Sequence, residues 1–328
     1  MEDNKQPLSE NNEDQPLKKD TKIVSDPDND VEPLISPIGA AFIGLIGGFF
    51  LYQIVGGLLT ILIFGLDVES IPVNSMRLMT MAGQILFILL PALLFSKWIY
   101  LDVGKIIRIR KPAWQEVGLF SLGIIILTPL LQSYLYIQNH FLEIWAQNSE
   151  FINSIKTFFD TLNKMVDATY SNLLSASNIF ELGFVVLVVA IVPAISEEAM
   201  FRGFVQRSFE LKLKPYFAIF LTAIFFSAYH FNPYGFVPLF ILGAFFGFTA
   251  YMSRSLVIPV FLHFLNNFSA VLLYHIVGDD ELIKSDAAIK GDELSSYLIM
   301  LVVLTLLFIF LIAIINKYYS QKTLTQEE

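Results

Sequence analysis

The feature that most constrains this chain is a series of long apolar segments separated by short polar ones. A helix needs about 20 consecutive apolar residues to cross the bilayer core, and 55% of the residues are hydrophobic. The sequence therefore predicts an all-α fold, a polytopic membrane helix bundle of about eight transmembrane helices. The expected spans are about Ile38–Phe64, Leu78–Ser96, Val117–Tyr136, Phe180–Ile195, Tyr216–His230, Phe236–Met252, Leu256–Tyr274 and Tyr297–Ile315.

Lysines and arginines near the ends of these spans predict the orientation of the bundle, because cytoplasmic loops carry an excess of them. Twelve lie on one side and five on the other. With the richer side inside the cell, both termini are expected to be cytoplasmic. The twelve are Lys97, Lys105, Arg108, Arg110, Lys111, Arg202, Arg207, Lys212, Lys214, Arg254, Lys317 and Lys322; the five are Arg77, Lys156, Lys164, Lys284 and Lys290.

Three segments differ in composition from the spans of the predicted bundle, residues 37–317. Residues 1–36 hold ten acidic and four basic side chains and few apolar ones, which predicts a disordered acidic tail. Residues 137–178 are polar with apolar residues at helical spacing, which predicts an extracytoplasmic insertion of amphipathic helices lying on the membrane. Residues 318–328 are expected to form a short polar tail.

Two adjacent carboxylates and an arginine follow the fourth apolar segment, in the sequence Ser-Glu-Glu-Ala-Met-Phe-Arg that begins at Ser196. A charge at membrane depth costs about 2.5–3.5 kcal/mol on insertion scales, so ionisable residues there are candidates for function. Glu198 and Arg202 are four residues apart and can pair on a helix. Glu197 points about 100° away from Glu198 and needs another partner.

Histidine and asparagine side chains on later spans could share a site with Glu197. His230 ends one apolar run, and His263 and Asn267 lie on one face of another. A carboxylate can act as general base toward water, one histidine can hold that water, and a second histidine with an amide can stabilise an oxyanion. The same set could instead ligate a divalent metal, or form a polar network that ties helices together. With no cysteine in the chain, neither a thiolate nucleophile nor a disulfide is available.

Glu197-Glu198-x-x-x-Arg202, Phe226-x-x-x-His230 and His263-x-x-x-Asn267, on successive apolar segments, resemble the motifs of the CPBP family. This group contains the CAAX prenyl proteases and the bacteriocin-processing (Abi) proteins. The resemblance covers about residues 180–275. It implies an intramembrane endopeptidase similar to the type II CAAX prenyl proteases.

The resemblance also implies a role for each matching residue. Glu197 corresponds to the glutamate that activates water, with His230 beside it, and His263 and Asn267 correspond to the oxyanion-stabilising pair. Glu198 and Arg202 are expected to support the site. No cofactor is firmly implied; if a divalent metal such as zinc is present, Glu197, His230 and His263 are its candidate ligands. The expected substrate is a membrane-associated or lipidated peptide or protein; the eukaryotic branch takes prenylated Cys-aliphatic-aliphatic-X substrates.

Two other functions fit the same pattern of spans. One is a catalytically silent scaffold or a bacteriocin self-immunity protein of the same fold, and the other is a transporter, since Gly- and Pro-interrupted spans can mark binding sites. Nothing in the sequence indicates nucleic-acid binding. The expected location is a bacterial plasma membrane. Because Glu197 would lie at the inner end of its span and His230 at the outer end, convergence of the site in the cytoplasmic half requires breaks at Pro193 or Pro233.

Overall fold

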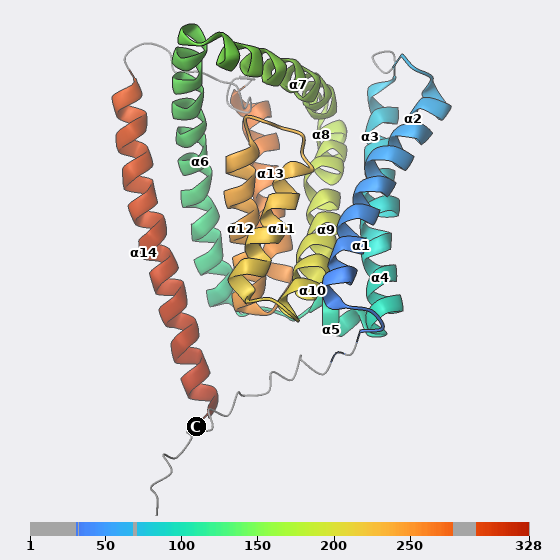
Figure 1. Cartoon of the computed structure of the whole chain (residues 1–328), viewed down its shortest axis with the longest axis vertical. Helices are drawn as coiled ribbons and strands as arrows, with labels where there is room; N and C mark the ends of the chain where they lie inside the picture. The colour runs from blue at the N-terminus through green and yellow to red at the C-terminus, as the bar shows by residue number, and fades with distance from the viewer. Residues whose placement is uncertain (1–30, 32, 68–70, 278–292, 328) are drawn as a thin grey trace, which may run out of the picture. The chain divides into compact units, whose positions relative to one another are not determined.

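A computed structural model describes residues 31, 33–67, 71–277 and 293–327 of the chain. All of its helices fall within one compact unit, residues 32–328, and the described residues contain no strand. Figure 1 shows these helices running side by side, with α7 crossing one end of them. Nearly all of the predicted acidic tail, together with Lys284 and Lys290, lies outside the described residues.

Seven helical runs of the described residues are long and apolar enough to cross a membrane, judged by length and composition. An eighth apolar helix, α11 (Pro215–Ala228), is shorter. The all-α bundle is therefore as predicted, with a difference at the fifth expected span. At about 1.5 Å per residue, α11 extends only about 21 Å. The seven runs are Pro37–Phe64, Val73–Tyr100, Trp114–Asn148, Ile179–Glu210, Phe236–Ser253, Val257–Ile276 and Leu294–Lys322.

Three of these runs contain wider π-helical turns, labelled η. The first is α1 (Pro37–Phe49), η2 (Phe50–Val55) and α2 (Gly56–Phe64). The second is α3 (Val73–Gln84), η4 (Ile85–Leu89) and α4 (Leu90–Tyr100). The third is α8 (Ile179–Val185), η5 (Val186–Ile191), α9 (Val192–Glu198), η6 (Ala199–Gln206) and α10 (Arg207–Glu210). Such turns are rare and often occur at functional sites.

The third run corrects the predicted end of the fourth span at Ile195. The helix continues through Pro193 and past the acidic pair to Glu210, so the proposed break at Pro193 is wrong. Its charged residues can stay in the helix because they pair: Glu198 with Arg202 at 2.9 Å, and Arg207 with Glu210 at 3.6 Å. Glu197 consequently lies well inside a span rather than at its end.

Two other predicted boundaries also move. Helix α6 (Trp114–Asn148) continues well beyond Tyr136, and α7 (Glu150–Leu174) makes up most of the remaining polar segment. Helix α14 (Leu294–Glu327) continues through most of the expected polar tail. The remaining helices are α5 (Val103–Ile107), α12 (Phe236–Ser253) and α13 (Val257–Val277).

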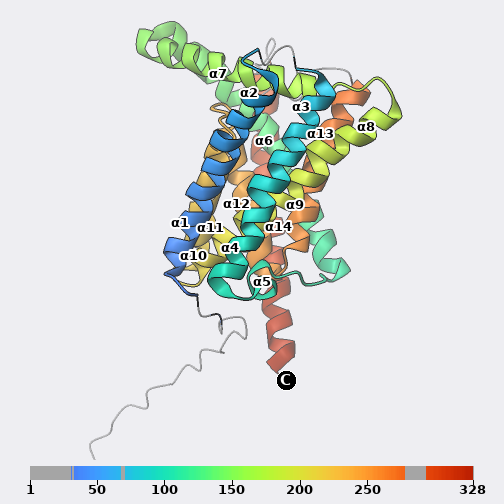
Figure 2. The same ribbon diagram turned by 90° about the vertical axis from the view of Figure 1, so that its right-hand side faces the viewer.

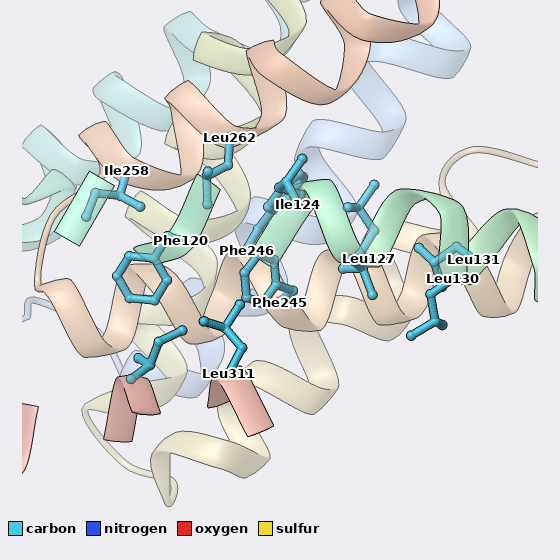
Figure 3. Packing of buried hydrophobic residues seen from close by; sticks show 12 residues of the cluster. Phe120, Ile124, Leu127, Leu130, Leu131, Phe245, Phe246, Ile258, Leu262 and Leu311 are labelled. Atoms are coloured by element: carbon cyan, nitrogen blue, oxygen red, sulfur yellow. The ribbon is translucent and has the colours of Figure 1, made fainter. Parts of the chain in front are cut away.

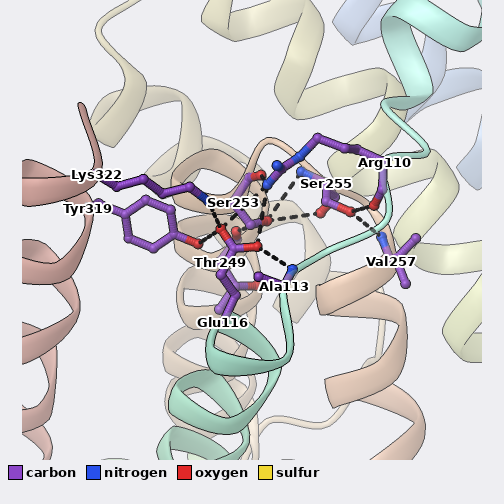
Figure 4. A network of polar contacts seen from close by, with 9 residues as sticks. All are labelled: Arg110, Ala113, Glu116, Thr249, Ser253, Ser255, Val257, Tyr319 and Lys322. Carbon is purple, nitrogen blue, oxygen red and sulfur yellow. Dashed lines mark hydrogen bonds and ion pairs between the residues drawn. The ribbon is translucent and has the colours of Figure 1, made fainter. Parts of the chain in front are cut away.

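The polar end of α14 is helical because it packs onto a buried carboxylate. Glu116, on α6, is fully buried. It accepts hydrogen bonds from Lys322 at 2.8 Å and from Tyr319 at 2.9 Å, and a backbone N–H at Ala113 bonds its second oxygen. Figure 4 shows these side chains meeting between the two helices, with Arg110 on the other side. The network ties α14 to α6 at one end of the bundle.

A large apolar core lies between α6, α12, α13 and α14 (Figure 3). Because lipid tails are themselves apolar, such a core holds spans together mainly through close packing. Outside it, α14 leaves Leu306, Ile309 and Phe310 about 60% exposed, as expected for side chains that face lipid. The core residues are Phe120, Ile124, Leu127, Leu130, Leu131, Leu242, Phe245, Phe246, Ile258, Leu262, Leu311 and Ile315.

Candidate active site

A buried charged cluster joins the first and third sequence motifs. Glu198 and Arg202 are both fully buried, and Arg202 Nη1 donates to Glu198 Oε1 at 2.9 Å. His263, from α13, reaches the same oxygen through Nδ1 at 2.8 Å. The pair expected from the four-residue spacing therefore forms, and His263 joins it. A buried ion pair is tolerated only when further hydrogen bonds satisfy it, and His263 supplies one.

Helix α12 packs against this cluster and supplies carbonyl acceptors to it. Arg202 Nη2 donates to the carbonyl of Gly243 at 3.0 Å, and one turn later Gln206 donates to the carbonyl of Gly247 at 3.0 Å. A Cβ at Gly243 would lie 2.8 Å from Phe226 and 3.3 Å from Arg202. The Gly-x-x-x-Gly pair is thus the surface onto which the helix carrying Glu198 docks.

Aromatic rings complete the surroundings of the arginine. The Arg202 guanidinium carbon lies 4.3 Å from the centre of the Phe226 ring and 5.4 Å from that of Phe246. Guanidinium groups are attracted to the negative faces of such rings. His263 stacks on Phe246 with ring centres 5.3 Å apart. Phe226, the first residue of the second motif, therefore packs against the charge rather than taking part in chemistry.

The hydrogen bonds of the two histidines determine which ring nitrogen is left for chemistry. His230 Nδ1 lies 2.7 Å from the carbonyl of Phe226. A carbonyl only accepts, so Nδ1 carries a proton and Nε2 of the neutral ring is an acceptor. His263 Nδ1 likewise donates to the Glu198 carboxylate. A further donation from His263 Nε2 requires a doubly protonated ring, for which Glu198 provides the opposite charge.

His230 follows the end of α11, at a strained turn. The next residue, Phe231, has a φ of 50°, a left-handed conformation that costs a bulky residue about 1–3 kcal/mol. The His230 ring lies against Phe226 with ring centres 4.8 Å apart, and His263 contacts the same phenylalanine at 6.2 Å. Both histidines therefore border one aromatic side chain.

Asn267 makes a bond that the sequence did not suggest. Its Nδ2 donates to the carbonyl of Val189 at 3.0 Å. Val189 lies in the π-helical turn η5, so this bond ties α13 to the helix that carries Glu197. Asn266 donates to Asn267 Oδ1 at 3.2 Å.

Glu197 stands apart from the ion-paired cluster. Its Oε1 accepts a hydrogen bond from Gln84 Nε2 at 3.0 Å, while its Oε2 is buried and has no bonding partner among the described residues. It makes no direct hydrogen bond with His230. Tyr170, from α7, is within electrostatic range: burial raises the pKa of this partly exposed tyrosine, and the charge of Glu197 raises it further.

The longer fourth span removes the difference in depth expected between Glu197 and His230. At about 1.5 Å per residue, Glu197 lies roughly 20 Å along the helix from Glu210, and His230 roughly 22 Å from Pro215, where α11 begins. Helices α10 and α11 are joined by a short turn, so the two heights are similar. Glu197 lies inside its span, and His230, just past the end of the short α11, lies at a similar height.

Metal ligation can be tested against the positions of the candidate ligands. In the part of the chain that the structure describes, no three His, Asp or Glu side chains come close enough to hold one ion. Glu197, His230 and His263 instead contact Gln84, the Phe226 carbonyl and Glu198, respectively. The Nδ1 bonds of the two histidines leave both Nε2 atoms open, but because the three side chains do not form one close group, we derive the chemistry from the side chains alone.

The three motifs lie on helices that meet around this cluster, and comparison with protein families covers the same part of the chain. Residues 179–269 match the family described as Type II CAAX prenyl endopeptidase Rce1-like. The match confirms the resemblance seen in the motifs, and we call these residues the Rce1-like segment. No curated protein and no solved structure matches the chain.

The Rce1-like segment does not contain every residue that bears on the site. Gln84, from α3, donates to Glu197, and Tyr170, from α7, lies within electrostatic range of it. Motif spacing could not identify them, because neither belongs to a repeated pattern with the acidic pair. The only signal in the sequence is that Gln84 is a polar residue inside an apolar span. The spacing of Gly243 and Gly247 is typical of helix packing, but it does not identify their carbonyls as acceptors for the site.

Proposed function

We propose that this integral membrane protein is an intramembrane endopeptidase that hydrolyses a peptide bond in a membrane-associated or lipidated substrate. The match of residues 179–269 to the Rce1-like family supports the class of activity. The observation that carries the proposal is the state of Glu197: inside a span, one oxygen is held by Gln84 and the other is left for chemistry. A bacterial plasma membrane is the location we propose.

In the proposed reaction, Glu197 Oε2 takes a proton from a water molecule as the water oxygen attacks the scissile carbonyl carbon. His230 Nε2 accepts a hydrogen bond from that water and orients it. The carbonyl oxygen becomes an oxyanion, which the doubly protonated His263 stabilises through Nε2 and Asn267 through its second amide hydrogen. Collapse of the intermediate breaks the C–N bond, and Glu197 returns its proton to the leaving amine.

The buried pair Glu198–Arg202 supports this chemistry without touching the substrate. It fixes the Nδ1 side of His263. Preorganised groups of this kind stabilise charge in a transition state without reorganising during the reaction.

Comparative peptide analysis of membranes tests the proposal. Cells carrying the wild type, Glu197→Gln, His230→Ala or no copy are compared, with Glu150→Gln and His275→Ala as controls away from the site. We expect the wild type and both controls to generate a peptide that the two site variants do not. Each variant must first accumulate in the membrane to the wild-type level, since loss of a buried polar partner can unfold a protein.

The same experiment distinguishes proteolysis from a scaffold or self-immunity role. Identical peptides from the wild type and well-expressed site variants would overturn proteolysis and favour a scaffold or self-immunity role. Repeating the wild-type measurement with purified protein and a chelator shows whether a metal takes part, because a side-chain mechanism predicts activity that survives chelation.

A further inference from the structure

Gln84 occupies an unusual position for an amide side chain. It ends α3, immediately before the π-helical turn η4, and only 6% of its surface is exposed. It lies in the second span, outside the Rce1-like segment. A buried amide in a membrane span is costly unless its groups find partners. The partner of its nitrogen is Glu197, while its Oε1 has no bonding partner among the described residues.

The bond gives the two oxygens of the Glu197 carboxylate different roles. The donation from Gln84 Nε2 at 3.0 Å holds Oε1 and so limits rotation of the group. This leaves Oε2, the oxygen without a bonding partner among the described residues, in a defined direction. A general base must be held within hydrogen-bond reach of the proton that it removes, and a fixed carboxylate meets that requirement better than a rotating one.

Helix α3 is itself anchored to the chain that leads into the Glu197 helix. Arg77, seven residues before Gln84 and so on the same helix face, is buried and donates to the carbonyl of Leu173 at 3.1 Å and to that of Ser175. These residues end α7, just before α8 begins at Ile179. The contacts of Arg77 and Gln84, two helical turns apart, therefore fix α3 against the end of α7 and against the helix that carries Glu197.

The first span supports Gln84 from the other side. Tyr52, in η2, packs so closely on Gly83 that a Cβ there would lie 3.2 Å from its ring. Its hydroxyl neighbours the Gln84 side chain. The absence of a side chain at position 83 leaves room for the tyrosine ring beside Gln84.

We infer that Gln84 is a positioning residue for the proposed endopeptidase, holding the Glu197 carboxylate so that its second oxygen faces the reacting water. The inference rests on the proposed role of Glu197. It adds a residue from the second span to a site whose motifs all lie in the Rce1-like segment.

Steady-state kinetics of Gln84→Met and Gln84→Glu, with purified protein and the peptide found above, test the inference. Methionine keeps the length without hydrogen bonding, and glutamate keeps the shape but replaces the donor by a negative charge. We expect kcat to fall about 10–100-fold in both, the range seen when an outer-shell partner is lost, with KM within about threefold. Gln132→Met and Gln132→Glu, at a buried amide on α6, are matched controls with kcat near wild type.

A space-filling role predicts a near wild-type Gln84→Glu enzyme, and that result would overturn the inference, as would equal losses in the Gln132 controls. Thermal unfolding separates this failure from failure of the proposed function. Gln84→Met should lower Tm less in a Glu197→Ala background than in the wild type. If the wild type cleaves nothing while this coupling is present, the proposed function fails and the contact stands; equal Tm shifts in both backgrounds would show that the contact itself does not form.

Discussion

Asn267 has a structural role and a proposed catalytic role, and its side chain can fill both only in one orientation. One amide hydrogen bonds the Val189 carbonyl, and the proposed mechanism gives the other to the oxyanion. The structural bond would hold the amide plane in place for the catalytic one.

Replacing Asn267 should therefore affect both stability and activity. Asn267→Leu removes the hydrogen bond to the Val189 carbonyl, which should cost about 0.5–1.5 kcal/mol of unfolding free energy, and it removes the proposed oxyanion donor, so activity should be lost. The measurements are detergent unfolding and peptide cleavage. A variant of wild-type stability would contradict the structural role, and a fully active one would contradict the catalytic role.

Gly243 should tolerate no side chain. A Cβ would lie 2.8 Å from Phe226 and 3.3 Å from Arg202, so Gly243→Ala is expected to lose about 1–3 kcal/mol of stability through overpacking and to reduce activity by moving Arg202. Gly118→Ala, in a helix with open space around it, is the matched control and should gain up to about 1 kcal/mol. Thermal midpoints and cleavage rates of the two variants decide the matter, and similar behaviour would argue against close packing at the site.

At the scale of elements, α7 is held by contacts at two positions, and each contacted segment is next to the site. Asp160 accepts a hydrogen bond from Tyr234, in the turn that follows His230, and one from Lys156 at 3.0 Å. The other end of α7 is held by Arg77. Figures 1 and 2 show this helix crossing the end of the bundle opposite α5 and α10. The docking of α7 therefore positions the turn after His230 and the segment that leads into the helix carrying Glu197.

The pH dependence of this docking follows from two shifted groups. Burial alone would raise the pKa of Asp160, but hydrogen bonds from Tyr234 and Lys156 outweigh it and hold that pKa below its ordinary 3.8. Burial would lower the pKa of Lys156, but Asp160 and Glu143 raise it above its ordinary 10.5. The stabilisation from Asp160 is thus present above about pH 4 and lost as the pH falls through its folded-state pKa. That from Lys156 is lost only as the pH rises above about 10.5.

Replacing Asp160 by asparagine should therefore cost stability at neutral pH but not in acid. Because the pair is partly exposed, we expect a difference of at most about 1 kcal/mol. The measurement is the thermal midpoint of wild type and Asp160→Asn between pH 3 and 8: the difference should be constant from pH 5 to 8 and shrink below pH 4. Glu150→Gln, at an exposed carboxylate of the same helix, serves as control; a difference that grows in acid would contradict the assignment.

At the scale of the whole molecule, the short α11 ends just before His230, and α12 leads back along it. In both views α1 begins and α14 ends at the same end of the bundle (Figures 1 and 2). That end carries α5 and its lysine-rich surroundings, which we expect to face the cytoplasm.

The absence of native cysteines makes the orientation directly measurable. Single variants Lys105→Cys, in α5, and Asn148→Cys, at the end of α6, place a thiol on exposed positions at the two ends. In intact cells, a membrane-impermeant maleimide should label Asn148→Cys and not Lys105→Cys, and both should react after permeabilisation. The reverse pattern would invert the proposed topology.

The sequence by itself determined the helical membrane class, the number of apolar helices and the resemblance of residues 179–269 to the Rce1-like family, because these depend on composition, periodicity and spacing along the chain. Only the tertiary structure decided where the fourth span ends, which oxygen of Glu197 is held, and that Gln84 and the Gly243 carbonyl bond residues of the site. Charges that pair can remain inside a helix, and a partner from another span leaves no local pattern. Both effects arise from contacts between residues far apart in the chain, which exist only once the helices have packed.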